Sequence, residues 1–213
     1  DLIVPSQRLG RNAETSALVS AFDDVGGAVG PVPGLMHAQH GRTGQARSAL
    51  AFVSGQAGIG KSSVVQAACD IMERHGALIG LGKFNQFGDS RPLWAVSQAL
   101  DGALARLQDA HVERHARVFD RIQIATAGIS AVLFDCLPRL LKLLGPQPEP
   151  PALSGEAAQV RFDLALRRLI GALGDERNPL VLVLDDVHWA DPPSLRLIES
   201  LIGDPSILHL LVI

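Results

Sequence analysis

Tyrosine is absent from this 213-residue chain, and cysteine, methionine and tryptophan occur only twice each. Cys69 and Cys136 lie far apart and match no metal-binding or redox spacing, so we expect two reduced thiols and a cytoplasmic protein. The chain also lacks an excess of basic residues. Its net charge of −3 gives no electrostatic footprint for nucleic acid. No apolar run approaches membrane-spanning length, and no secretory signal is expected.

Apolar residues are abundant, at 47% of the chain, and can build a substantial core. We expect one domain over residues 1–213. The chain begins with Asp1 rather than methionine, and residues 207–213 form an apolar run typical of a strand. These two ends predict that the chain is an excised piece of a larger protein, truncated after its fourth strand.

Residues 55–62 read Gly-Gln-Ala-Gly-Ile-Gly-Lys-Ser and fit the phosphate-binding pattern G-x-x-x-x-G-K-[ST]. Glycines let successive backbone N–H groups surround phosphate oxygens. Lys61 is expected to reach the β- and γ-phosphates and to act in catalysis, and the Ser62 hydroxyl to ligate Mg²⁺. The predicted nucleotide-binding residues of this loop are Gly55, Gln56, Ala57, Gly58, Ile59, Gly60, Lys61, Ser62 and Ser63.

The surroundings of this motif suit a P-loop. Residues 49–53 form an apolar run that predicts a buried strand, and a helical pattern follows Lys61 until Gly76. The helix would add its N-terminal dipole to the bound anion. The alternative is a glycine turn with an exposed lysine. The context favours a site for a nucleoside triphosphate.

Strand and helix patterns alternate along the chain. We predict a helix over 12–22, strands over 77–81 and 180–184, a mostly helical insertion over 84–178, and a last strand over 207–213. Such alternation favours an α/β fold with a parallel sheet flanked by helices. A long flexible loop is expected over residues 26–45. His37 and His40 lie in it, and a solvated insertion is favoured there over a metal site.

An apolar strand that ends in two acids is the partner that a P-loop needs. We assign Asp185 to Mg²⁺ coordination, and Asp186 to the catalytic alignment of the attacking water. The alternative is a strand end that simply turns into solvent. His188 is expected to be a structural histidine rather than a phosphate sensor. Trp189 is expected to pack under the turn, and Asp191 to cap the next helix.

Three segments resemble the AAA-type ATPase modules of STAND signalling proteins. They are residues 9–14, the P-loop, and residues 182–191, which include the double acid and Trp-Ala-Asp. The resemblance implies a P-loop fold of the AAA-like class with ATP and Mg²⁺ as cofactors. It also implies that Gly10, Arg11 and Glu14 lie by the adenine.

Residues 82–87, Gly-Lys-Phe-Asn-Gln-Phe, are similar to a segment of such modules inside large bacterial signalling proteins, as are residues 144–148 and 159–162. There the module lies between a Ser/Thr-kinase-like domain and GAF and histidine-kinase domains. This implies a slow ATP switch whose partners are neighbouring domains of the same chain, with homo-oligomerisation left open. Asn85 stands where aspartate is usual. In the family's strand order, Lys83 or Asn85 would contact an acid and report the nucleotide state.

Two other functions compete with the switch ATPase. A catalytically inactive ATP-binding scaffold would use the helical insertion as a partner surface. A small-molecule kinase would transfer the γ-phosphate to a hydroxyl, but the double acid followed by His188 and Trp189 suits water activation in the resembled family. A role in DNA loading is the weakest alternative, because the chain is acidic.

Overall fold

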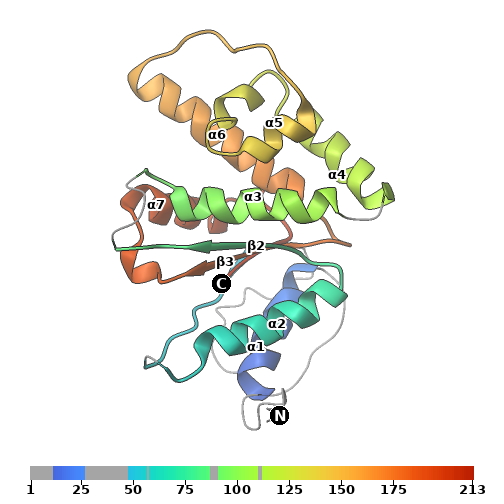
Figure 1. Cartoon of the computed structure of the whole chain (residues 1–213), viewed down its shortest axis with the longest axis vertical. Coiled ribbons are helices and arrows are strands. Elements are labelled where there is room, and N and C mark those ends of the chain that lie inside the picture. The colour runs from blue at the N-terminus through green and yellow to red at the C-terminus, as the bar shows by residue number, and fades with distance from the viewer. Residues whose placement is uncertain (1–11, 27–47, 57, 87–90, 110–111) are drawn as a thin grey trace, which may run out of the picture.

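The computed structural model describes residues 12–26, 48–56, 58–86, 91–109 and 112–213. Within these ranges four strands form one sheet in the order β1-β4-β3-β2, with helices on both faces (Figure 1). Every pairing is parallel, which confirms the predicted α/β class. The strands are β1 (Ser48–Leu50), β2 (Leu78–Lys83), β3 (Leu180–Asp185) and β4 (Leu210–Val212).

The helices account for most of the remaining described chain. They are α1 (Asn12–Gly26), α2 (Lys61–Arg74), α3 (Trp94–Gln108), α4 (Val112–Ala125), α5 (Pro138–Leu144), α6 (Gly155–Leu173) and α7 (Pro192–Ile202), with 3-10 turns at Ser130–Leu133 and Val187–Trp189. None of those in the described ranges combines the length and apolar character needed to cross a bilayer.

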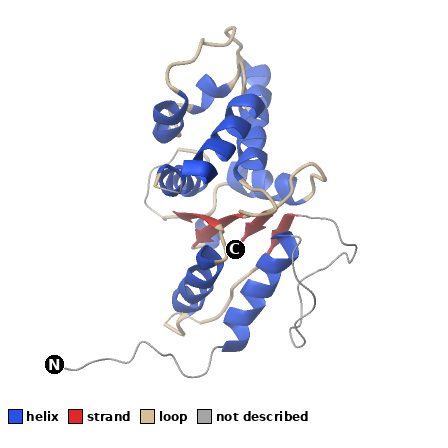
Figure 2. Ribbon diagram, turned by 90° about the vertical axis from the view of Figure 1, so that its right-hand side faces the viewer, coloured by secondary structure: helices blue, strands red, loops and turns tan. Residues whose placement is uncertain are grey.

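Both faces of the sheet are covered (Figure 2). Side chains alternate along each strand, so Val181 and Leu211 lie in one core with α1 and α2. Leu180, Leu182 and Leu210 lie in the second core, with α3, α6 and α7. Because β3 is covered on both sides, it is apolar nearly throughout, as its sequence predicts.

The helices α3 to α6 lie between β2 and β3 in the chain, which confirms the predicted helical insertion. α3 lies directly on the sheet, and α4, α5 and α6 form a further layer beyond it (Figure 1). Leu104 of α3, Ile122 of α4 and Leu140 of α5 are fully buried in the core that these helices share with the sheet. The insertion is therefore continuous with the sheet's own core.

Glycine allows α3 to approach β2 very closely. A Cβ atom on Gly82 would lie 2.0 Å from the carbonyl oxygen of Ala95, and one on Gly80 would lie 2.2 Å from that of Ala99. No side chain fits at such distances, so these two positions set the contact between the edge strand and the insertion.

The strand ends differ from those predicted. The strand before the P-loop covers Ser48–Leu50 rather than 49–53, and the last strand covers Leu210–Val212 rather than 207–213. The pairing of β1 with β4 explains the first difference. Leu50 is paired with Val212, the last residue of β4, and beyond that pair Ala51 N donates one more hydrogen bond to Val212 O. β2 runs on to Lys83, since β3 offers it partners up to Asp185.

Two helix boundaries also differ. α1 continues to Gly26, so the first residue of the predicted loop over 26–45 is helical instead. Its remainder, with His37 and His40, lies outside the described residues. Leu93, in the stretch predicted to be mostly helical, precedes α3 with a φ of 64°. Its side chain is buried all the same.

Capping at α7 is as predicted. The Asp191 side chain accepts a hydrogen bond from Ser194 N at 3.0 Å and another from Ser194 Oγ at 2.7 Å, and Pro192 opens the first turn. Asp191 also accepts from the backbone N of Leu93 at 3.3 Å, so the same carboxylate joins α7 to the start of α3. Ser154 stands at the N-cap of α6 without a capping hydrogen bond from its side chain.

Replacing Gly82 with alanine should destabilise the fold by about 1–3 kcal/mol, because the new methyl group cannot fit against Ala95 O. Urea denaturation of the two proteins measures the difference. Gly102→Ala in α3 is the matched control. Nothing lies within 4 Å of that position, so alanine should stabilise the helix slightly. Equal effects of the two substitutions would contradict the close packing.

The buried thiol of Cys69 should make stability depend on alkaline pH. Burial, and then the nearby charge of Asp70, raises its pKa from 9.0 to about 11. Between these values the unfolded chain loses the proton and the folded chain keeps it. The free energy of unfolding should therefore fall from about pH 9 to about pH 11. Urea denaturation of Cys69→Ala should show a smaller fall over that range, and an equal fall would contradict the assignment.

Candidate nucleotide-binding site

The loop between β1 and α2 has the backbone shape that its glycines predict. Gly58 has a φ of 76° and Gly60 a φ of 93°, which is the left-handed region that favours glycine. Gly60 is the N-cap of α2, and Ser63 N and Val64 N donate to its carbonyl oxygen. Ala57 lies outside the described residues. The loop therefore leads directly into the N-terminus of a helix.

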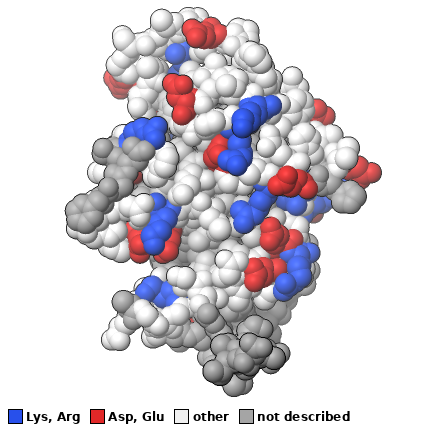
Figure 3. Space-filling model, in the orientation of Figure 1, with Lys and Arg blue, Asp and Glu red and all other residues white. Residues whose placement is uncertain are grey.

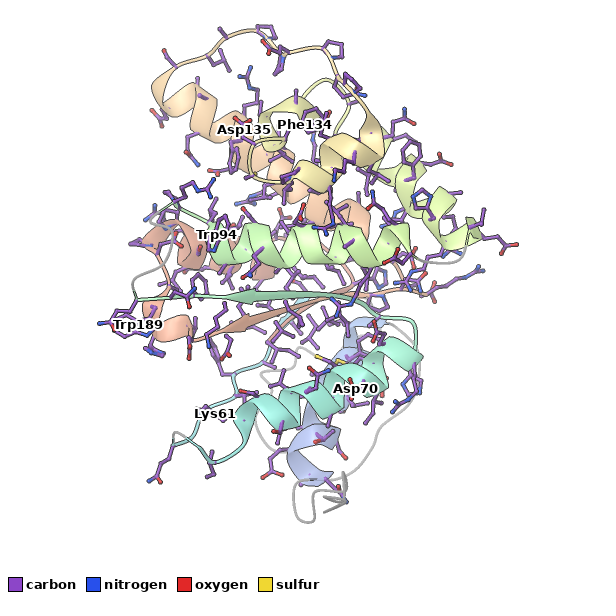
Figure 4. The ribbon with its side chains drawn as sticks, in the orientation of Figure 1. Lys61, Asp70, Trp94, Phe134, Asp135 and Trp189 are labelled. Carbon is purple, nitrogen blue, oxygen red and sulfur yellow. The ribbon has the colours of Figure 1, made fainter. Side chains whose placement is uncertain are left out.

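Lys61, the first residue of α2, folds its side chain back over this loop. Its Nζ donates to Gly55 O at 2.8 Å and to Gln56 O at 3.1 Å. Ser62 follows in the first turn with an exposed side chain. In Figure 4, Lys61 lies at the end of α2 beside the carboxyl end of the sheet.

The two acids stand at the carboxyl end of β3. Asp185 is its last residue, and Asp186 follows with a φ of 56°, in the left-handed region. That conformation is uncommon for a residue with a side chain and is held here by a hydrogen bond from Asp186 N to Asp185 Oδ1 at 2.9 Å. The sharp turn keeps both carboxylates at the end of the sheet.

A lysine pairs with these acids. Lys83 Nζ lies 3.1 Å from Asp186 Oδ2 and 3.9 Å from Asp185 Oδ2. The hydrogen bond to Asp186, and then the charges of both acids, raise the pKa of Lys83. The sequence predicted a contact from Lys83 or Asn85, and Lys83 is the one confirmed. Among the described residues, Asn85 makes no hydrogen bond to either acid.

The P-loop and the acids line one cavity of about 1030 Å³. The predicted residues found in its wall are Gly55, Lys61, Ser62, Asp185 and Asp186. Ser62 and Asp185 supply a hydroxyl and a carboxylate oxygen, the hard ligands that Mg²⁺ prefers, so the donor set fits this ion. The described ranges hold no group of three or more His, Cys, Asp or Glu side chains arranged for a metal.

Several lining residues were not found from the sequence. They are Phe52 and Val53 after β1, Gln98 of α3, and Leu195, Ile198, Glu199 and Ile202 of α7. Leu195, Ile198 and Ile202 follow the three- and four-residue spacing of a helix stripe. That pattern was readable from the sequence, but the prediction for this helix stopped at its cap. Phe52 is 75% exposed.

The other predicted residues differ in position: one lines the cavity, one stands apart from it, and two lie outside the described residues. Trp189 is 43% exposed and does not pack under the turn as predicted, and Figure 4 shows it at the rim of the molecule. Its ring tilts against that of His188 at 5.0 Å. His188 is exposed and lines the cavity, and its structural role stays a prediction. Gly10 and Arg11 lie outside the described residues.

Basic and acidic side chains are interspersed over the visible face (Figure 3). Arg121 pairs with Asp175 at 2.8 Å and Arg167 with Asp204 at 3.2 Å. The face seen in Figure 3 shows no broad basic patch of the kind that nucleic acid needs.

Comparison with known proteins identifies the family. The AAA ATPase domain family matches residues 34–213. Hybrid signal transduction histidine kinase G of Dictyostelium discoideum is 34% identical over 153 residues, which are 70% of this chain and 4% of that protein. No solved structure matches. These findings confirm the resemblance read from the sequence: the chain belongs to the AAA ATPase domain family.

Proposed function

We propose that this domain binds ATP with Mg²⁺, hydrolyses it slowly, and acts as a regulatory switch in a multidomain signalling protein. One observation carries the proposal: Lys61 and Ser62 line the same cavity as Asp185 and Asp186. The two pairs come from different strand ends, and the parallel sheet brings them to one edge.

Phosphate binding falls to the P-loop. Its backbone N–H groups and the N-terminus of α2 surround the β- and γ-phosphates. Lys61 would exchange the carbonyl oxygens of Gly55 and Gln56 for phosphate oxygens, which are stronger acceptors for an ammonium group. Gly10 and Arg11 are assigned to the adenine side on the family resemblance alone.

Ser62 and Asp185, which both line the cavity, are the proposed ligands of Mg²⁺. A bound Mg²⁺ supplies charge neutralisation for the phosphates. Asp186 would accept a hydrogen bond from water and align it with the γ-phosphate. No arginine is found among the described residues that line the cavity. Without such a cation P-loop hydrolysis can be slower by roughly 10³–10⁵, which is why we propose slow turnover.

The signalling role is proposed from the relative, which is named as a signal transduction histidine kinase. The matched part of this chain corresponds to 4% of the length of that protein. A small part of a large protein suits a switch that acts on neighbouring domains of the same chain. A movement of β2 on nucleotide binding would also move α3 and the insertion, because α3 packs directly against β2 at Gly80 and Gly82. Nucleic acid is not among the proposed partners.

A second candidate function has one observation in its favour. Asp186, the proposed aligning acid, already pairs with Lys83 at 3.1 Å. If this pair persisted with ATP bound, the acid would not reach water. The domain would then be an ATP-binding scaffold.

Single-turnover release of phosphate from γ-labelled ATP by the intact protein separates the two. Lys61→Ala should lower ATP affinity by about tenfold or more, because a charged hydrogen-bond donor is lost. Asp186→Asn should retain ATP binding and lower the cleavage rate by roughly 10²–10⁴. Lys142→Ala, an exposed lysine on α5, is the matched control and should match the wild type in both assays.

Each outcome has a clear meaning. Cleavage that survives Asp186→Asn unchanged would contradict the assigned role of that acid. A wild-type protein that binds ATP but never cleaves it would favour the scaffold. ATP affinity unaffected by Lys61→Ala would overturn the site itself.

A further inference from the structure

Lys83 is placed against the acid pair by the sheet. It is the last residue of β2 and lies directly opposite Asp185 in the parallel register. Its backbone N donates to Gln98 Oε1 at 3.0 Å, and the next residue donates from Phe84 N to Asp185 O at 3.0 Å. The peptide groups on both sides of Lys83 are therefore hydrogen-bonded, and the end of the strand holds this lysine beside the acids.

The side chain itself is free to leave. The Lys83 side chain is 54% exposed, and its Nζ lies 3.1 Å from Asp186 Oδ2 in the wall of the cavity. An exposed ion pair of this kind contributes little net free energy, because water screens it and the long side chain loses freedom in forming it, so a stronger cation can replace the ammonium group. Lys61, the other lysine in the described wall, is engaged with loop carbonyls and does not compete for the acids.

We propose that Lys83 is a resident counter-cation: it offsets one of the two negative charges of Asp185 and Asp186 while the site is free of metal, and releases the acids when Mg²⁺ enters with ATP. This inference rests on the proposed function and adds a role for a residue outside the P-loop and the acid pair. Two bare carboxylates would repel the phosphates of a metal-free nucleotide. With Lys83 present, that repulsion is reduced before the metal arrives.

The same charge must oppose the metal. An ammonium group bonded to Asp186 and close to Asp185 repels a divalent cation and occupies carboxylate oxygens that the cation would use. Lys83 therefore makes ATP binding less dependent on Mg²⁺ than the acids alone would make it. The quantity to measure is the ratio of the ATP dissociation constant in EDTA to that in excess Mg²⁺.

Isothermal titration of the intact protein with ATP, in EDTA and in excess Mg²⁺, gives this ratio. Lys83→Met should weaken metal-free ATP binding about fivefold, the effect of one charge about 4 Å away in water. Binding of Mg²⁺·ATP should stay the same or tighten, so the ratio should rise about fivefold or more. Lys83→Arg, which keeps the charge, and Lys142→Met, an exposed lysine on α5, should both keep the wild-type ratio.

A double variant tests whether the effect passes through the acids. Adding Asp186→Asn to Lys83→Met removes one of the two carboxylate charges, and metal-free ATP binding should return toward the wild-type value. An unchanged ratio in Lys83→Met would overturn the proposal. An equal loss of affinity in EDTA and in Mg²⁺ would also overturn it, because Lys83 would then contact the nucleotide in both states.

Failure of the proposed function gives a different result. If the wild-type protein bound no ATP under either condition, the nucleotide site would be wrong and the titrations could not judge Lys83. Electron paramagnetic resonance of Mn²⁺ with nucleotide-free protein then decides. Lys83→Met should bind Mn²⁺ about fivefold more tightly than the wild type, and equal affinity would contradict the counter-cation role.

Discussion

The pairing of β3 with both of its neighbours holds the site together. β3 bonds to β2 on one side over its whole length and to β4 on the other, and its apolar side chains are covered on both faces. Because the strands are parallel, all of their carboxyl ends meet at one edge. The acids that end β3, the lysine that ends β2 and the loop that follows β1 are neighbours for that reason alone.

Much of this arrangement could be predicted from residues. The glycine pattern with Lys61 and Ser62 specifies a loop and a helix start, and both are present. The five apolar residues of 180–184 followed by two acids specify a central strand and its carboxyl end. A local pattern is enough to predict such a feature when all of the residues that define it lie in one segment. The roles of these residues toward ATP and Mg²⁺ stay predictions.

The rest depended on contacts between distant segments. Where β1 and β4 end is decided by how far they pair with each other, which neither strand reveals alone. The choice of Lys83 over Asn85 follows from the register opposite Asp185. Exposure of Trp189 follows from the turn after Asp186, whose left-handed backbone was not predicted. Close packing of α3 needed Gly82 to meet Ala95, a contact between two elements.

The charges of the cavity argue that nucleotide binding here is governed by cations. Among the described lining residues, two lysines face three carboxylates, those of Asp185, Asp186 and Glu199. A triphosphate adds several negative charges to a wall that is already negative, so side chains alone cannot hold it. In the proposed function, the amides of the P-loop and a divalent cation supply the difference. Lys83 is the one lysine of the described wall that pairs with these acids, so in the proposed role it sets how strongly binding depends on the metal.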